Sequence, residues 1–263
     1  MIKGLDHVVI LVRDLDTAVR DYTALGFTVV PGGEHADGKS RNALVSFADG
    51  AYLELIAFQG AVPKEHPFYR EGVDHGLITY ALLPDNVERT VQEARERGLG
   101  MTPPRSGGRL RPDGVRLDWQ TSQPPSRDLP FLCYDITSRD LRVPGGDAHK
   151  HANGATGIQR LGIAVENVSE SKKRYSALLG PEAALGDIHP PDGTQRSAFQ
   201  VGGTAIVLMQ SVGNAHLKKY LQRRGEGPYR MVLQAEGANA RHGHVDPQDA
   251  CGVMLGFRQP AEK

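Results

Sequence analysis

The chain has 263 residues, enough to build two lobes or one large domain around a sizeable core. Its 31 basic and 31 acidic side chains give a formal net charge of zero, which does not favour nucleic acid or an anionic membrane surface as a partner. The apolar content of 39% is typical of a globular protein, and no apolar run approaches the roughly 18 residues of a membrane span.

The first 58 residues predict a βαβββ unit. Its first strand is "HVVILV" at residues 7–12, followed by a helix at residues 14–25 with Asp14 or Asp16 as its N-cap. "FTVVPGG" is a second strand, and "NALVSF" and "AYLELIAF" form a hairpin around the tight-turn pair Asp49-Gly50.

The same pattern returns later in the chain. At residues 157–210, "LGIAV" predicts a strand, "VSESKKRYSALLG" a helix and "SAFQVGGTAIVLMQ" a hairpin. Residues 76–135 repeat the pattern more weakly, and the last strands, "YRMVLQAEG" and "CGVMLGF", leave little room for a helix. We therefore predict an α+β protein of about four βαβββ modules in tandem, the last one abbreviated. The Gly-rich stretch "RVPGGDAHKHANGAT" links an N-terminal lobe, residues 1–145, to a C-terminal lobe, residues 155–263.

His7 and Glu54 are the strongest candidates for a functional pair. Strand alternation places Glu54 on the same face as Tyr52, while the opposite face of that strand is continuously apolar. A carboxylate in such a strand must be solvated, paired or bound to a cation. Imidazole and carboxylate are suitable ligands for zinc, iron, manganese or nickel, although either residue alone is more often a surface or hydrogen-bonded residue than a ligand.

The internal repeat supports a functional interpretation of this pair. In the third module the corresponding positions hold Arg160 and Val207. The fold therefore does not require His and Glu there, and their joint presence in the first module indicates a function.

The repeat, with His on the first strand and Glu on the fourth, resembles the vicinal oxygen chelate (VOC) superfamily. "GLDHVVILVRDLDTAVRDYTALGF" followed by "NALVSFADGAYLELIAF" is similar to its glyoxalase-like branch. The resemblance implies half-open barrels of the glyoxalase, bleomycin-resistance and dihydroxybiphenyl-dioxygenase type. It also implies a divalent metal ion, held by His7 and Glu54, that acts as a Lewis acid on a substrate with two neighbouring oxygens.

The second module departs from this resemblance, which implies a further His and Glu there. Its first-strand ligand position falls at Ile78 by counting, and His75 lies three residues earlier, so His75 is the third candidate metal ligand. The fourth-strand position holds Cys133, which is either a thiol ligand or a buried structural cysteine.

Several further residues are candidates for substrate binding. His35, Arg41 and Asn42 lie around the start of the third strand, and the loop before Trp119 carries Arg111 among other arginines. A guanidinium beside an aromatic face suits a carboxylate-bearing or planar substrate. A solvated basic loop with Trp119 in the core is the alternative interpretation, and the catalytic residues remain unassigned.

The leading hypothesis is a glyoxalase-like metalloenzyme, a lyase, isomerase or dioxygenase, acting on a small oxygen-rich molecule. The alternative is a metal-free protein that binds or sequesters a small molecule, as the bleomycin-resistance type does. Two cysteines, Cys133 and Cys251, make no disulfide framework, so we expect a reducing, cytoplasmic location. Internal pairing of modules makes either a monomer or a homodimer compatible with the sequence.

Overall fold

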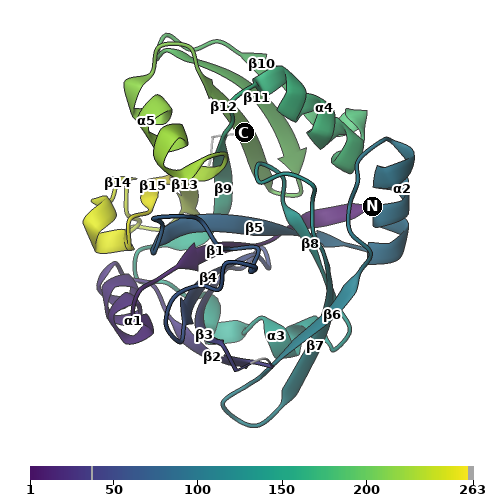
Figure 1. Ribbon diagram of the computed structural model, residues 1–263. Helices are drawn as coiled ribbons and strands as arrows, with labels where there is room; N and C mark the ends of the chain where they lie inside the picture. The colour runs from purple at the N-terminus through teal and green to yellow at the C-terminus, as the bar shows by residue number, and fades with distance from the viewer. Residues whose placement is uncertain (37, 260–263) are drawn as a thin grey trace.

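The computed structural model describes residues 1–36 and 38–259, and its strands fall into two sheets (Figure 1). The N-terminal lobe contains β1 (Ile2–Leu11), α1 (Leu15–Ala24), β2 (Val30–His35), β3 (Ser40–Ser46), β4 (Tyr52–Phe58), β5 (Gly76–Pro84), α2 (Val87–Glu96), β6 (Arg105–Leu110), β7 (Arg116–Ser122) and β8 (Phe131–Asp135). The short α3 (Arg139–Arg142) and a 3₁₀ turn (Gly146–His149) follow. The C-terminal lobe contains β9 (Ala155–Ala164), α4 (Val168–Leu179), β10 (Ala184–Ile188), β11 (Thr194–Val201), β12 (Thr204–Ser211), α5 (Ala215–Arg224), β13 (Gly227–Ala235), β14 (Gly243–His244) and β15 (Met254–Arg258).

The α+β fold with tandem βαβββ modules is confirmed. β1 to β4 with α1, β5 to β8 with α2, and β9 to β12 with α4 are three complete modules. The fourth consists of β13, β14 and β15 without an α-helix, as the short C-terminal segment predicted. The helix α5, between the third and fourth modules, was not predicted. Its sequence "AHLKKYLQRR" buries only Leu217 and Leu221, too few residues for a clear helical pattern.

Side-chain caps determine where the module helices begin. Asp14 accepts a hydrogen bond from the Thr17 amide at the start of α1, which identifies it as the N-cap rather than Asp16. Asn86 caps α2 and Asn167 caps α4 in the same way. The equivalent caps follow the first strand of each complete module, so the repeat extends to the local hydrogen bonding.

The N-terminal lobe closes into a complete barrel with the strand order β1-β4-β3-β2-β6-β7-β8-β5. β1 lies between β4, its parallel neighbour, and β5, its antiparallel neighbour. On the far side β2 pairs with β6, where Glu34 faces Leu110 and His35 faces Arg109. This pairing closes the barrel further than the half-open form expected from the resemblance.

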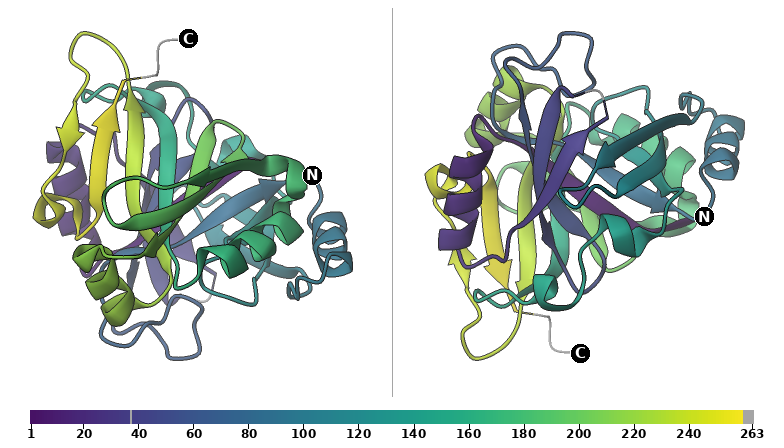
Figure 2. Two further views of the ribbon diagram at one scale, coloured as in Figure 1. Left: turned by 90° about the horizontal axis from the view of Figure 1, so that it is seen from above. Right: turned by 90° about the horizontal axis from the view of Figure 1, so that it is seen from below.

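The C-terminal lobe is an open seven-stranded sheet, β10-β11-β12-β9-β13-β15-β14. Its fourth module contributes too few strands to reach β10, so the two edges do not meet. Figure 2 shows these green and yellow strands as a layer distinct from the purple and blue strands of the barrel.

The main core lies between the barrel wall and the second sheet. Residues of β1 such as Val8 and Ile10 point out of the barrel and belong to the same buried cluster as Leu161 and Leu233 of the second sheet. The residues between them in β1, such as Val9 and Leu11, point into the barrel and form a separate cluster with Ile78, Phe131 and Cys133 among others. Successive side chains of β1 therefore point alternately into the main core and into the barrel interior.

The predicted linker is packed between the lobes. The His151 ring accepts a hydrogen bond from the Thr28 amide at 3.0 Å, and its other nitrogen lies 3.1 Å from the Ser46 carbonyl oxygen. None of the helices in the described residues is long and apolar enough to cross a membrane.

Candidate functional site

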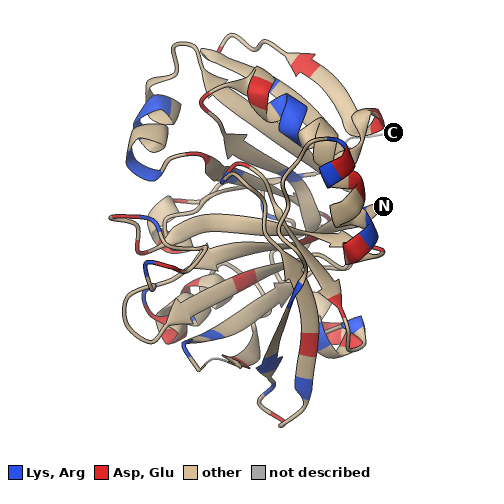
Figure 3. Ribbon diagram, turned by 45° about the vertical axis from the view of Figure 1, so that its right-hand side comes forward, with Lys and Arg blue, Asp and Glu red and all other residues tan. Residues whose placement is uncertain are grey.

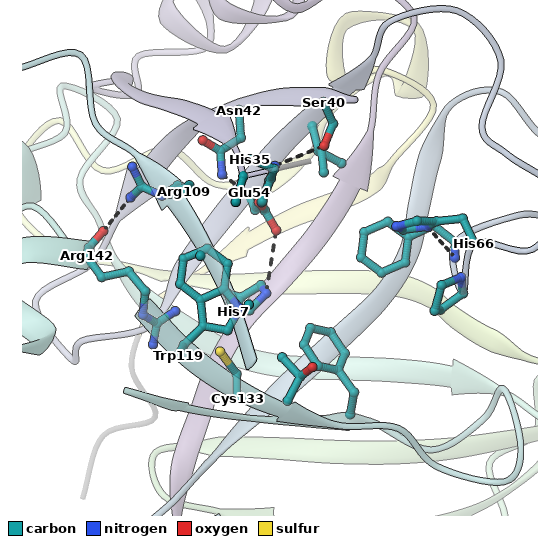
Figure 4. Close-up of a pocket in the computed structure, with 18 of the residues that line it drawn as sticks. His7, His35, Ser40, Asn42, Glu54, His66, Arg109, Trp119, Cys133 and Arg142 are labelled. Carbon is teal, nitrogen blue, oxygen red and sulfur yellow. Dashed lines mark hydrogen bonds and ion pairs between the residues drawn. The ribbon is translucent and has the colours of Figure 1, made fainter. Parts of the chain in front are cut away.

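A cavity of about 370 Å³ occupies the interior of the barrel (Figure 4). Its polar wall includes His7, His35, Ser40, Asn42, Glu54, Arg109 and Arg142, and its apolar wall includes Ile56, Phe68, Trp119, Phe131 and Cys133. The cavity is of the size that takes a small molecule, and polar groups gather on one side of it.

Strand geometry brings His7 and Glu54 together. β1 and β4 are parallel neighbours in which His7 pairs with Tyr52, so Glu54 lies two residues further along the same inward face. The His7 Nε2 atom lies 3.6 Å from Glu54 Oε2. Both residues are almost completely buried, with 4% and 6% of their surface exposed.

Glu54 has two further polar neighbours from β2 and β3. Its Oε1 atom accepts a hydrogen bond from the Asn42 amide at 2.6 Å and lies 3.6 Å from His35 Nε2. The other nitrogen of the His35 ring, Nδ1, is 3.0 Å from the Ser40 hydroxyl. Glu54 therefore lies between two imidazole rings inside the barrel, that of His7 on β1 and that of His35 on β2.

Asp6 determines which nitrogen of His7 faces the cavity. Its carboxylate lies 2.6 Å from His7 Nδ1 and is completely buried. An ionised carboxylate only accepts hydrogen bonds, so Nδ1 carries a proton and Nε2 is the ring nitrogen that faces Glu54. Metal-binding histidines are commonly oriented by a carboxylate in this way.

Two arginines keep Asp6 ionised. Arg142 donates to both of its oxygens, at 3.0 and 2.8 Å, and Arg139 also contacts it. Burial opposes ionisation, but the Arg142 charge and the His7 ring hold the pKa of Asp6 well below its usual value. Arg142 also binds Asp135 and the Tyr52 hydroxyl, so the network joins β1, β4, β8 and α3.

Charge also favours the ionised form of Glu54. Burial raises its pKa, whereas the His7 and His35 rings and the Asn42 amide lower it, and the resulting pKa lies below the usual value. In contrast, burial raises the pKa of the Cys133 thiol far above its usual range. The cavity wall therefore contains an ionised carboxylate on β4 and a neutral thiol on β8.

The donor chemistry of His7, His35 and Glu54 suits zinc, iron(II), manganese or nickel. Among the described residues, however, no group of three or more His, Cys, Asp or Glu side chains is arranged as a complete metal site. The strand register places Ala81 opposite His7 and Cys133 two residues beyond the partner of Ala81. The second module thus supplies neither the His nor the Glu that the resemblance implies.

Three predicted site residues lie away from the cavity. Arg41 neighbours Asn42 on β3 and so points to the outside of the barrel, where it lies 3.4 Å from Asp16. Arg111 lies beyond the end of β6 and binds Asp113 in the hairpin turn.

His75 also lies outside the barrel, against Asp74 and next to Gly252 of the other lobe. In the structure the β5 residue that pairs with His7 is Ala81. The helix caps Asp14 and Asn86 align His7 with Thr79, one residue beyond the predicted Ile78, and His75 lies outside the candidate ligand set.

Asp6 and Arg142 are the important site residues that the sequence did not indicate, and Arg109 is one of the other arginines of the loop before Trp119. Arg109 points inward because it is paired with His35 at the β2–β6 closure. Asp6 lies directly before His7, and this adjacency was the available signal for it. Arg142 belongs to the predicted linker, and no local pattern relates it to the first strand.

A family model described as a glyoxalase-like domain matches residues 5–179 of this chain. The comparison with curated proteins finds no match. A crystal structure of a hypothetical protein from Staphylococcus aureus is similar, with a TM-score of 0.71 and 14% identity, and the match covers 97% of this chain and 99% of that one.

Two enzymes of known name share the fold at lower similarity. A variant of 4-hydroxymandelate synthase from Streptomyces coelicolor has a TM-score of 0.58 and 13% identity, covering 90% of this chain and 72% of that one. A xylose isomerase-like TIM barrel/4-hydroxyphenylpyruvate dioxygenase fusion protein has a TM-score of 0.56 and 15% identity, covering 90% and 37%. The family match and the tandem modules agree, and the chain belongs to the glyoxalase-like domain family of the vicinal oxygen chelate superfamily.

Proposed function

We propose that the chain is a metal-dependent enzyme that binds a small, oxygen-rich anionic substrate in the barrel cavity. His7 and Glu54 hold the divalent cation, and His35 is the third protein ligand. The supporting observation is the approach of His7 Nε2 to Glu54 Oε2 at 3.6 Å while the proton of the ring is committed to Asp6. With Nδ1 facing Asp6, Nε2 is the nitrogen that would coordinate a cation shared with the Glu54 carboxylate.

The distances support a shared cation better than a direct hydrogen bond. A separation of 3.6 Å is longer than an N–H···O hydrogen bond. It would allow both atoms to bind one divalent ion through bonds of about 2.1 Å. His35 Nε2 lies at the same 3.6 Å from the other oxygen of Glu54, which makes it the nearest candidate for a third ligand.

The remaining cavity wall favours a compact anion with a planar part. Arg109 is 4% exposed and forms no ion pair among the described residues; its hydrogen bonds go to the carbonyl oxygens of Gly32 and Arg142. Its charge therefore remains available to an anionic substrate. Trp119 and Phe131 supply flat apolar surface opposite the polar groups.

When bound, the cation supplies Lewis-acid stabilisation of negative charge on a substrate oxygen. The chain itself orients His7 through Asp6, positions Glu54 through Asn42 and excludes water with the aromatic wall. These roles are compatible with lyase, isomerase or oxygenase chemistry, which share an oxygen-chelated substrate.

Metal analysis tests the proposal. The protein and its H7A, E54Q and H75A variants are purified without chelators, and the metal content per chain is measured by elemental analysis. We expect about one divalent ion in the wild type and in H75A, whose ring lies outside the barrel, and strong depletion in H7A and E54Q. Equal metal content in the wild type and H7A, with circular dichroism showing both folded, would contradict it.

A metal-free small-molecule-binding protein is the second candidate, and the second module supports it. Ala81, which pairs with His7, and Cys133 on β8 add no imidazole or carboxylate to the cavity, and Asn42 already donates a hydrogen bond to Glu54. This candidate predicts that a ligand co-purifying in the cavity stays bound in EDTA and that no variant changes the metal content.

A further inference from the structure

The face of the second sheet that corresponds to the barrel interior carries four arginines. They are Arg160 of β9, Arg196 of β11, Arg230 of β13 and Arg258 of β15. The proposed function does not involve them. Figure 3 shows acidic and basic residues distributed along the ribbon of both lobes, so this concentration of one sign is not a property of the whole chain.

The strand register equates two of these arginines with residues of the barrel site. His7 pairs with Tyr52 across β1 and β4, and Arg160 pairs with Ala205 across β9 and β12. In the neighbouring hairpins, Asn42 pairs with Ile56, and Arg196 pairs with Met209. Arg160 thus takes the place of His7, and Arg196 takes the place of Asn42.

The positions of the other two arginines, Arg230 and Arg258, correspond to residues of β5 and β8 in the second half of the barrel. Thr79 of β5 pairs with Val9, two residues after His7, and Arg230 pairs with Gly162, two residues after Arg160. Arg258 stands two residues beyond the partner of Val232, as Cys133 stands two residues beyond the partner of Ala81. The duplicated face therefore holds arginine at three positions equivalent to residues that line the barrel cavity, His7, Asn42 and Cys133, and at a fourth position equivalent to Thr79.

The side chains lie together on one face. A Cβ atom added at Gly162 would lie 3.0 Å from Cγ of Arg230 and 3.1 Å from the sulfur of Met209. Arg160 is on that same face, two residues before Gly162, while the intervening Leu161 points into the main core. The glycine leaves room for the Arg230 side chain to lie flat across the middle of the sheet.

These charges are poorly neutralised. Asp192 pairs with Arg196. Among the described residues, Arg160, Arg230 and Arg258 form no ion pair and no side-chain hydrogen bond. Partial burial and the charges of Arg258 and Arg196 lower the pKa of Arg160. Burial and the charge of Arg196 lower the pKa of Arg230, although Asp192 partly opposes this. Like charges held this close cost stability unless an anion lies among them.

We propose that this arginine cluster binds a phosphate group, of a phosphomonoester or of inorganic phosphate. Guanidinium groups form paired hydrogen bonds with the oxygens of a phosphate, and three unpaired arginines more than balance its charge of about −1.5 to −2 near neutral pH. The site is independent of the barrel metal centre and binds whether or not that centre is loaded.

Calorimetric titration tests the proposal. Inorganic phosphate and glycerol phosphate are titrated separately into the wild type, R160Q, R230Q and the control R89Q, with ionic strength held constant by sodium chloride. Arg89 is an exposed arginine on α2, far along the chain from the cluster, and is paired with Asp85. We expect saturable binding that R160Q and R230Q each weaken at least tenfold and that R89Q leaves unchanged; tighter binding of glycerol phosphate identifies a monoester site.

Thermal unfolding provides a second measurement. Phosphate should raise the melting temperature of the wild type and R89Q but not that of R160Q or R230Q. Glutamine retains a long side chain over the apolar face, and the use of two variants guards against a folding defect in either. An absence of saturable binding, or binding that survives both substitutions because phosphate occupies the barrel cavity, would overturn the proposal.

Discussion

Replacement of Asp6 by asparagine should destabilise the protein far more than its single-atom change suggests. Asp6 is completely buried and accepts hydrogen bonds from Arg142, Arg139 and His7. Asparagine retains one oxygen but places an NH₂ group among these donors, and it leaves the buried Arg142 guanidinium without one of its two carboxylates.

Removing one partner of a buried ion pair typically costs about 3–5 kcal/mol. Asp135 still binds Arg142, so we expect a loss near the lower end, about 3 kcal/mol. The D6N variant should also lose about 10- to 100-fold in metal affinity, because His7 loses the carboxylate that orients its ring.

Urea unfolding at pH 7, followed by circular dichroism, measures the loss in stability. The matched control is D74N, since Asp74 forms a similar pair with Arg13 but both side chains are more than half exposed. We expect no resolvable change in the control, because exposed ion pairs contribute little. A D6N variant as stable as D74N would refute the network as a stabilising element.

Two further predictions concern the pH dependence of stability and the cooperative unfolding of the two lobes. Because the pKa values of Asp6 and Glu54 are lowered from their ordinary 3.8 and 4.5 in the folded state, the unfolded state binds protons first as the pH falls. The free energy of unfolding should therefore be fully present above about pH 5 and decline below it, more steeply in the wild type than in D6N, and a flat profile from pH 5 to 3 would argue against the low pKa values. L233A removes a fully buried side chain of β13 and should cost about 2–5 kcal/mol. Since the main core spans both lobes, the fluorescence of Trp119 in the barrel should report the same shift as circular dichroism, whereas an unmoved Trp119 transition would show independent lobes.

The sequence predicted only some of the residues of the candidate site. His7 and Glu54 were identified because an internal copy of the module replaces them with Arg160 and Val207. His35, Asn42 and Trp119 line the same cavity, as their positions beside the third strand and the basic loop suggested. No feature of the sequence separated Arg41 and Arg111 from these residues. Only the structure shows that Arg41 points out of the barrel and that Arg111 lies in a turn.

The sequence by itself determined the repeated βαβββ modules, the abbreviated last module and the inward face of β4. These features depend on local alternation, capping residues and turn signals, which are encoded within a few residues of each other. The tertiary structure alone decided the closure of the barrel at His35 and Arg109, the register that pairs Ala81 with His7, and the contact of Asp6 with Arg142. Those contacts join residues far apart in the chain, and a shift of one residue in strand pairing reverses which side chains face the cavity.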